Sequence, residues 1–309
     1  MRIRDRIHGT HNAEVDQRNE NIWISINGAF FRRDEAKISV FDSGYLVGDG
    51  VWEGIRLHHG VLVFVDDHLR RLWTAAKATG IELPFSKDTL IKSIHDTLKK
   101  NEMQDGVHVR VMVTRGIKKT PSQDPRLTIS GPNVVIIAEY KKASSVTKRD
   151  GIKLFTSSFR RGRPDYLDPK LNCHSKLHEV QALIQAIEAG ADEALMLDVN
   201  GFVSTCNATN FFIIKDGAVW TSTGAYCMNG ITRQKVIDLC QSNNISCFQK
   251  NFSLYDTYSA DQAFVTGTFG GLTPVNSIDG KAIENNSDFS LLKQLNELYE
   301  ELIIDESKS

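Results

Sequence analysis

The sequence predicts an α+β protein of two domains, the first smaller than the second. The chain has 309 residues, enough for two domains of ordinary size. Strand-like alternation and amphipathic helical patterns occur in both halves. A polar, turn-rich stretch, ASSVTKRD at residues 143–150, separates the halves. We therefore expect a flexible lead at residues 1–20, a small α/β domain at 21–142 and a large domain at 150–309.

The first half opens with a hairpin and continues with two helices. Alternating apolar residues flank Asn27-Gly28, a dipeptide typical of a tight hairpin turn. A helix is expected from about His68 to Thr79, with Asp66 or Asp67 as its cap and Gly80 as its stop. The other elements predicted here are a helix over Ser86–Lys100 with Ser86 as N-cap, strands at Val107–Arg115 and Val134–Tyr140, and a loop or lid over residues 118–132.

The second half alternates between strands and helices. Its predicted strands are Ile152–Ser158, Glu193–Leu197, Phe211–Ile214 and Asp261–Thr266, and its predicted helices are Leu177–Ala189, which Gly190 ends, and Arg233–Ser242. An irregular basic segment, residues 160–176, leads into the first of these helices.

Composition narrows the class of protein. The net charge of −1 indicates no general attraction to nucleic acid, and no apolar run reaches the length of a membrane span. The five cysteines are scattered without a CxxC pair, so they suggest neither a disulfide framework nor a zinc site. A reducing cytoplasm fits this cysteine usage, and we expect no metal.

The run Gly230-Ile231-Thr232-Arg233 opens a predicted helix and resembles an anion seat. The first turn of a helix has unpaired N–H groups and the positive end of the helix dipole, so it favours phosphate. Thr232 adds a hydroxyl, and Thr266-Gly267-Thr268 ends a strand with further polar groups.

The stretch from Asn200 to Ile237 resembles the signature of the class IV aminotransferases, the fold-type IV pyridoxal-phosphate enzymes. The motifs that match are Asn210, Phe212, the pair Val219-x-Thr221, Met228-x-Gly230-Ile231-Thr232-Arg233, and the blocks FDSGYLVGDGVWEGIR, HLRRL, GADEALMLDVNG and ADQAFVTGTFGGLTPVNSIDG. The resemblance covers nearly all of the chain after about Trp23. It implies a two-domain enzyme that works as a homodimer, holds pyridoxal 5'-phosphate, and uses an amino donor and a 2-oxo acid acceptor.

The resemblance also implies roles for single residues. Arg71, Ile231, Thr232 and Thr268 match positions that hold the cofactor phosphate, with Arg70 the better candidate for an ordinary solvated arginine. Arg56, Arg110 and the Thr268-Phe269 amides are candidates for the substrate side, and Tyr45 matches a pocket-lining position. The alternatives are an ion pair of Arg56 with Glu53, a salt bridge for Arg110 and an ordinary core position for Tyr45.

The expected Schiff-base lysine is absent from its place. Counted without gaps from Asp168-Pro169, that place is taken by Asn172. We favour Lys176 as the replacement, because it falls where relatives place a tyrosine near the reacting carbon. Lys170 is the alternative and would need a two-residue bulge in HSKL. A third reading is that neither lysine forms the Schiff base.

Thr205 is a second departure from the family pattern. The signature has a glutamate there, which holds the pyridine nitrogen of the cofactor in its protonated form. A threonine hydroxyl offers only a neutral hydrogen bond. The sequence therefore predicts an atypical aminotransferase, with a lyase resembling aminodeoxychorismate lyase, or a non-catalytic descendant that binds pyridoxal phosphate or another phosphate, as alternatives.

Overall fold

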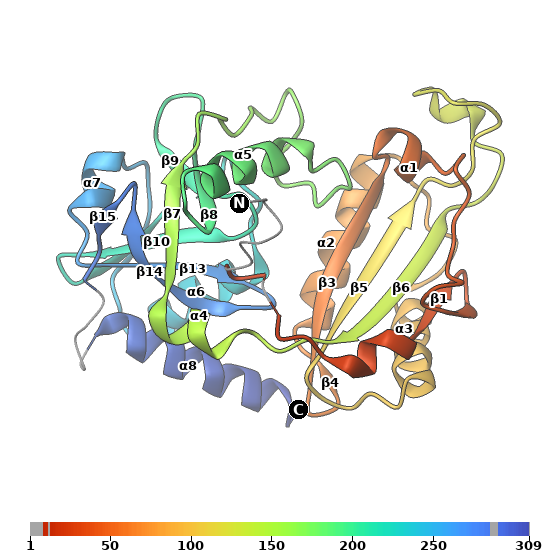
Figure 1. Ribbon diagram of the computed structural model, residues 1–309, viewed down its shortest axis with the longest axis horizontal. Helices are drawn as coiled ribbons and strands as arrows, with labels where there is room; N and C mark the ends of the chain where they lie inside the picture. Colours follow the sequence, from red (N-terminus) through yellow and green to blue (C-terminus); the bar gives the residue numbers. More distant parts are fainter. Residues whose placement is uncertain (1–8, 12, 285–289, 309) are drawn as a thin grey trace. The chain divides into compact units, whose positions relative to one another are not determined.

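A computed structural model describes residues 9–11, 13–284 and 290–308 (Figure 1). The chain divides into two compact units. The small unit contains residues 14–142, residues 171–176 and the chain end from Glu306, and the large unit contains the rest. The chain thus leaves the large unit at Leu171 and returns to it at Leu177.

The small unit is built on a six-stranded antiparallel sheet with the order β2-β1-β6-β5-β3-β4. Its strands are β1 (Trp23–Ile26), β2 (Ala29–Arg32), β3 (Gly50–His58), β4 (Val61–Leu62), β5 (Val107–Thr114) and β6 (Asn133–Tyr140). Its helices are η2 (Gln17–Asn21), α1 (Ser43–Val47), α2 (Val65–Ala78), α3 (Lys87–Lys100) and η3 (Pro125–Leu127).

One face of this sheet is packed against α2 and α3 (Figure 1). Side chains alternate between the two faces of a strand, and Val51, Ile55 and Leu57 of β3 enter the core. Trp52 and Arg56 therefore point to the opposite face, as does Arg110 of β5. That second face carries the polar and aromatic residues that the sequence singled out.

The segment 171–176 lies alongside β3. The carbonyl oxygen of Asn172 accepts a hydrogen bond from Trp52 N at 3.0 Å, and His174 N donates to Gly50 O at 2.9 Å. A bridge between Val51 and Cys173 lies between these two bonds. The segment thus pairs with the first residues of β3, on the edge whose last residues, Leu57 and His58, pair with β4.

The large unit is a mixed nine-stranded sheet with the order β12-β11-β10-β13-β14-β7-β8-β9, and β15 pairs with β14. Its strands are β7 (Ile152–Thr156), β8 (Glu193–Leu197), β9 (Val203–Cys206), β10 (Asn210–Lys215), β11 (Ala218–Thr221), β12 (Cys247–Gln249), β13 (Gln262–Gly267), β14 (Gly271–Ile278) and β15 (Lys281–Ala282). Its helices are α4 (Ser145–Asp150), α5 (Leu177–Glu188), α6 (Ile231–Ser242), α7 (Leu254–Tyr258) and α8 (Leu291–Glu306). Helix α5 covers β7 and β8, while α6 packs on β12 and β13.

Most predicted elements are confirmed, and the differences lie at element ends. Helix α2 begins at Val65, and its N-cap is Phe64 in the left-handed region with φ 52°. Asp66 and Asp67 stand in the first turn, so the prediction that one of them caps the helix is wrong. There they face the positive end of the helix dipole, which explains an acidic pair at this point. Helix α6 begins at Ile231, two residues earlier than predicted.

Two segments predicted to lack regular structure are ordered in part. Residues 145–150 form α4, because Ser144 caps it by accepting a hydrogen bond from Thr147 N at 3.3 Å. In the predicted flexible lead, residues 1–8 and 12 lie outside the described residues. Of the described residues in this stretch, Thr10 is buried against Glu193, and η2 spans Gln17–Asn21.

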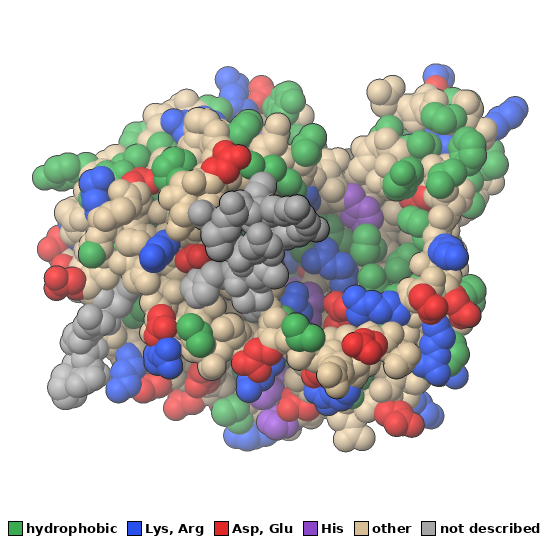
Figure 2. All heavy atoms as spheres, viewed as in Figure 1, with side chains coloured by type: hydrophobic (Ala, Val, Ile, Leu, Met, Phe, Trp, Pro, Cys, Tyr) green, Lys and Arg blue, Asp and Glu red, His purple; other side chains and the backbone are tan. Residues whose placement is uncertain are grey.

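The surface mixes charges of both signs. Figure 2 shows acidic and basic side chains interspersed over the viewed face, in keeping with 37 basic and 38 acidic residues. Within the described part of the chain, no helix combines the length and the apolar character that a membrane crossing requires.

Candidate functional site

The first turn of α6 carries the run Gly230-Ile231-Thr232-Arg233, which the sequence analysis compares to an anion seat. The N-cap is Gly230, which has no side chain with which to cap the helix. Ile231 and Thr232 are buried in this turn. The backbone N–H groups at the start of this 12-residue helix therefore have no side-chain cap and keep their capacity to bind an anion.

Asn210 holds the chain that leads into this turn. Its Nδ2 donates to Met228 O at 2.9 Å, and its Oδ1 accepts from Gly230 N at 3.2 Å. A Cβ added at Gly230 would overlap Asn210 Oδ1, so only glycine fits at this point. The sequence motif is thus explained by close packing of the turn on the asparagine amide.

Arg233 anchors the other side of the same turn. Its guanidinium is buried, and Nη2 donates to Ser222 O at 2.6 Å and to Gln249 Oε1 at 3.0 Å. Burial lowers the pKa of Arg233, but an arginine remains charged in proteins. Arg233 therefore fixes α6 to the ends of β11 and β12.

One polar residue near the end of β13, Thr266, lies across from Asn210. Thr266 is the cross-strand partner of Asn210, and opposed residues of an antiparallel pair project from the same face of the sheet. The Thr266 hydroxyl is buried and has no hydrogen-bond partner among the described residues. Thr268 and Phe269 follow in the short turn between β13 and β14. A buried hydroxyl without a partner beside an uncapped helix start fits a phosphate group.

Thr205 is buried on β9, and its hydroxyl is already engaged. The hydroxyl donates to Thr209 O at 2.7 Å and accepts a hydrogen bond from Asn210 Nδ2 at 3.4 Å. The hydrogen bond of Asn210 thus links Thr205 to the α6 turn, which places two predicted site residues in one network. Because the hydroxyl hydrogen is used by the backbone, Thr205 can offer only a lone pair to a ligand.

A buried carboxylate does lie close to Thr205, on the neighbouring strand β8. Glu193 accepts from Thr209 Oγ1 at 2.8 Å and from the hydroxyl of Thr10. Burial raises the pKa of the Cys206 thiol well above its usual range, and the charge of Glu193 adds to this rise. Two hydroxyl groups therefore hold Glu193 in place within the large unit.

In the small unit, Arg71 belongs to a buried ion-pair cluster. Its Nε and Nη2 donate to the two carboxylate oxygens of Glu53, each at 2.7 Å, and His68 Nδ1 lies 2.8 Å from Glu53 Oε2. Burial alone would raise the pKa of Glu53, but the hydrogen bonds and charge of Arg71 outweigh it, and the net shift is downward. Burial lowers the pKa of His68. The alternative that Glu53 pairs with Arg56 is wrong, because the two residues point to opposite faces of β3.

The second face of the small sheet carries a stacked cation. The Arg110 guanidinium lies 3.9 Å from the centre of the Trp52 ring, a cation–π arrangement. Burial lowers the pKa of Arg110, and Glu139 partly offsets this. His108 lies two residues before Arg110 on the same face, next to Gly54, where an added Cβ would come within 2.8 Å of its Nε2. These contacts orient a positive charge on a face that also carries Arg56.

Two other predicted residues occupy less specific settings. Tyr45 lies in α1 and is 72% exposed, so the interpretation as an ordinary core aromatic is wrong. Phe269 is half-buried in the β13–β14 turn.

Asn172 occupies a defined position against β3. Its Nδ2 donates to Trp52 O at 2.7 Å, while its buried Oδ1 has no hydrogen-bond partner among the described residues. Lys176 is half-buried at the end of the same segment, directly before α5. Lys170 is exposed in a turn of the large unit, where its N–H donates to Asp168. Asn172 and Lys176 thus belong to the small unit and Lys170 does not.

Three residues to which the sequence analysis assigned no functional role hold the predicted site residues in position. Asn210 orients the α6 turn, Arg233 fixes that helix, and Glu53 orients Arg71. The sequence signal was present for Asn210 and Arg233, since both stand in the quoted motif, but the partners through which they act lie far along the chain.

Comparison with known proteins identifies the family. Residues 50–278 match the model of the family described as Amino-transferase class IV. A putative branched-chain-amino-acid aminotransferase of Methanocaldococcus jannaschii is 38% identical over 280 residues, covering 90% of this chain and 96% of that protein. Branched-chain-amino-acid aminotransferase-like protein 2 of Arabidopsis thaliana is 37% identical over 87% of this chain. The chain spans about half the length of that relative, 48%.

A solved structure supports the same assignment. The T.th. branched-chain amino acid aminotransferase complexed with N-(5'-phosphopyridoxyl)-L-glutamate superimposes with a TM-score of 0.84. It is 28% identical, and the match covers 93% of this chain and 95% of that one. Its fold is that of the fold-type IV aminotransferases, as the resemblance predicted. The signature around α6, the shared architecture and the family match together show that this chain belongs to the class IV aminotransferase family.

Proposed function

We propose that this protein is a pyridoxal-phosphate-dependent aminotransferase that moves an amino group between an amino acid and a 2-oxo acid. The family match and the M. jannaschii relative, named as a putative branched-chain-amino-acid aminotransferase, support this function. The solved relative binds a phosphopyridoxyl group joined to glutamate, which supports the cofactor and the amino-acid substrate class.

The observation that carries the proposal is the anion seat at α6. Gly230 leaves the helix start uncapped, Asn210 fixes the turn, and the Thr266 hydroxyl is buried without a partner among the described residues. These groups suit the phosphate of the cofactor. Ile231, Thr232 and Thr268 would hold the phosphate, and the resemblance assigns Arg71 to the same group.

The remaining roles follow from side-chain chemistry. Pyridoxal phosphate, when bound, supplies a conjugated ring that accepts electrons from the substrate carbon. Arg110 and Arg56 are the cations proposed to bind the substrate carboxylate, with Tyr45 and Phe269 lining the pocket. Lys176 is proposed to attach the cofactor and to move the proton at the substrate carbon. Thr205 would accept a hydrogen bond from the pyridine nitrogen only while that nitrogen is protonated, and a neutral oxygen holds this proton less firmly than a glutamate would, which predicts slower chemistry.

The assembly and location are also proposals. The family resemblance favours a homodimer, and cysteine usage favours a reducing compartment such as the cytoplasm.

A second function is favoured by Asn172. Its amide is hydrogen-bonded to the backbone of β3 and cannot form a Schiff base. If Lys176 does not replace the missing lysine, the chain binds the cofactor phosphate without transferring amino groups.

Phosphate binding is tested with a glycine pair. In Gly230→Ala the new Cβ overlaps Asn210 Oδ1, so the α6 turn must shift and cofactor affinity should fall at least about tenfold. Gly131→Ala is the matched control, because a Cβ there meets nothing within 4 Å. Equal affinities of the two variants, measured by titration with pyridoxal phosphate, would rule out the α6 seat.

Attachment is tested by borohydride reduction followed by peptide mass spectrometry. Modification of Lys176, lost in Lys176→Met and kept in Lys170→Met, supports the aminotransferase. Conversion of the amine-loaded enzyme by 2-oxoglutarate then reports transamination. If cofactor binds at the α6 seat but no lysine is modified, the second function holds.

A further inference from the structure

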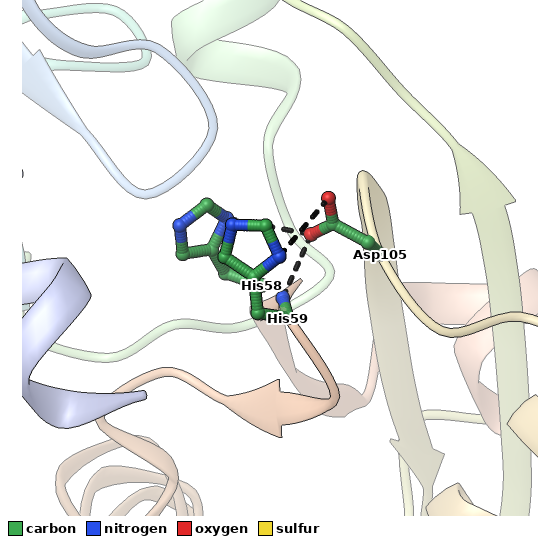
Figure 3. A group of neighbouring side chains, drawn as sticks. All are labelled: His58, His59 and Asp105. Carbon is green, nitrogen blue, oxygen red and sulfur yellow. Dashed lines mark hydrogen bonds and ion pairs between the residues drawn. The ribbon is translucent and has the colours of Figure 1, made fainter. Parts of the chain in front are cut away.

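Two histidines and an aspartate gather at one end of the small sheet (Figure 3). His58 ends β3, His59 lies in the turn to β4, and Asp105 lies in the turn before β5. His58 Nδ1 lies 3.4 Å from Asp105 Oδ1, and His59 Nδ1 lies 3.7 Å from Asp105 Oδ2. One ligand atom from each residue lies within 4.8 Å of the others. None of the three belongs to the proposed aminotransferase site.

The backbone of the turn brings the two imidazoles together. Consecutive residues of a strand point to opposite faces, but His59 and Gly60 have φ values of 47° and 84° and form a two-residue hairpin loop between His58 and Val61. This left-handed geometry turns the His59 side chain back beside that of His58. Their ring centres are 4.2 Å apart, and both rings lie next to the Asp105 carboxylate in Figure 3.

Backbone hydrogen bonds hold the two turns in place. His59 N donates to Asp105 Oδ1 at 2.8 Å, and Gly60 N donates to Gln104 O at 2.7 Å. The arrangement of the three side chains therefore follows from main-chain geometry and does not depend on a chance approach of long, mobile side chains.

The spacing suits a small divalent ion. Zinc binds histidine nitrogen and carboxylate oxygen at about 2.0–2.2 Å in tetrahedral geometry. Two ligand atoms at adjacent tetrahedral corners are then about 3.3–3.6 Å apart. Each histidine Nδ1 lies at about this distance from a different oxygen of Asp105, His58 at 3.4 Å from Oδ1 and His59 at 3.7 Å from Oδ2, so both carboxylate oxygens lie beside the imidazoles. Three protein ligands leave a fourth corner open for water.

The charge states are also those of metal ligands. Burial lowers the pKa of His58, and the charges of Arg56 and His59 lower it further, while Asp105 opposes them. Burial would raise the pKa of Asp105, but hydrogen bonds from the backbone N–H groups of His59 and Gly106 give a net downward shift. Metal binds neutral imidazole and ionised carboxylate, and the two shifts favour these forms of His58 and Asp105.

We propose that His58, His59 and Asp105 form a binding site for a divalent transition-metal ion, with Zn²⁺ as the best-matched ion. Imidazole nitrogen and carboxylate oxygen favour such ions, and histidine ligands exclude a site designed for Ca²⁺ or Mg²⁺. A bound ion ties the β3–β4 turn to the turn before β5. The site stabilises the small unit whether or not the chain is an aminotransferase.

The test is metal titration of chelator-treated full-length protein. ZnCl₂ is followed by calorimetry, and CoCl₂ by its visible absorption, which reports the coordination of the ion. The variants are His58→Gln, Asp105→Asn and His59→Asn, the last because asparagine tolerates the left-handed backbone. Removing a group that only orients a metal ligand costs roughly 10–100-fold in affinity, so loss of a ligand itself should weaken binding at least about tenfold.

His95→Gln is the matched control, because His95 is an exposed histidine outside the cluster. It should bind Zn²⁺ as the unchanged protein does, and circular dichroism checks that every variant is folded. The proposal is overturned if the unchanged protein binds no Zn²⁺, or if the three ligand variants bind it as tightly as His95→Gln does.

Discussion

The ion-pair cluster of the small unit allows one prediction to be worked out in detail. In Arg71→Met, the Glu53 carboxylate stays fully buried and loses two hydrogen bonds of 2.7 Å. Breaking a buried pair by removing one partner costs about 3–5 kcal/mol, because the other charge is left uncompensated. At about 2–4 °C per kcal/mol, the melting temperature of the small unit should fall by roughly 6–20 °C.

The two partners are not equivalent. The Arg71 side chain is 18% exposed and that of Glu53 is 0% exposed, so a lone arginine can reach water and a lone glutamate cannot. Glu53→Gln should therefore cost less than Arg71→Met. The double variant Glu53→Gln/Arg71→Met should be more stable than Arg71→Met alone, since it leaves no buried charge.

His68 gives this prediction a pH signature. In the unchanged protein the folded pKa of His68 is lowered, so the unfolded chain binds that proton more readily and stability falls as pH drops through about 6.5. Burial is the main cause of the lowered pKa and remains in Arg71→Met, but the repulsion by the Arg71 charge is gone, so the pKa of His68 is lowered less in this variant. The stability that His68 costs as pH drops is therefore smaller in Arg71→Met than in the unchanged protein. The difference in unfolding free energy between the unchanged protein and Arg71→Met should thus be smaller at pH 5.5 than at pH 7.5.

The assay is urea unfolding of the apo-protein followed by tryptophan fluorescence. Trp23, Trp52 and Trp73 lie in the small unit and only Trp220 in the large one, so the signal reports mainly the small unit. The reasoning is refuted if the coupling between the two substitutions is under about 0.5 kcal/mol, the level of independent sites. If the loss of unfolding free energy in Arg71→Met does not change with pH, the role given to His68 is refuted.

Two further predictions concern a helix cap and cysteine reactivity. Ser86→Ala should lower the free energy of unfolding by about 1 kcal/mol, because Ser86 Oγ accepts from Thr89 N at 3.1 Å at the start of α3. Ser86→Asp should be nearly neutral in the same urea assay, and equal losses in both would exclude the cap. In labelling with iodoacetamide at pH 7.5, Cys247 should react first, because the Cys240 hydrogen bond and then the Arg233 charge lower its pKa against the effect of burial. Cys206 should react last, since burial raises its pKa, and mass spectrometry showing early labelling of Cys206 would contradict this.

The sequence by itself determined the elements and the family. The Asn27-Gly28 turn, the Ser86 cap and the helix start at Gly230-Ile231 are local features, because each depends on the backbone preferences of a few neighbouring residues. Alternation along β3 and β5 is likewise a local property, and it sets which side chains share a face. The signature around Asn210 was sufficient to indicate the phosphate seat.

Only the tertiary structure decided which residues act on one another. It pairs Glu53 with Arg71 in place of Arg56, places Asn172 against Trp52, and brings Asp105 to His58 and His59. Local patterns carry no signal for such contacts, since their partners are 18, 120 and about 47 residues apart and meet only when sheet edges and turns assemble. The departures from the family pattern at Asn172 and Thr205 were visible in the sequence. Their hydrogen-bond partners come from the fold, and these partners define which polar atoms each side chain can still offer a ligand.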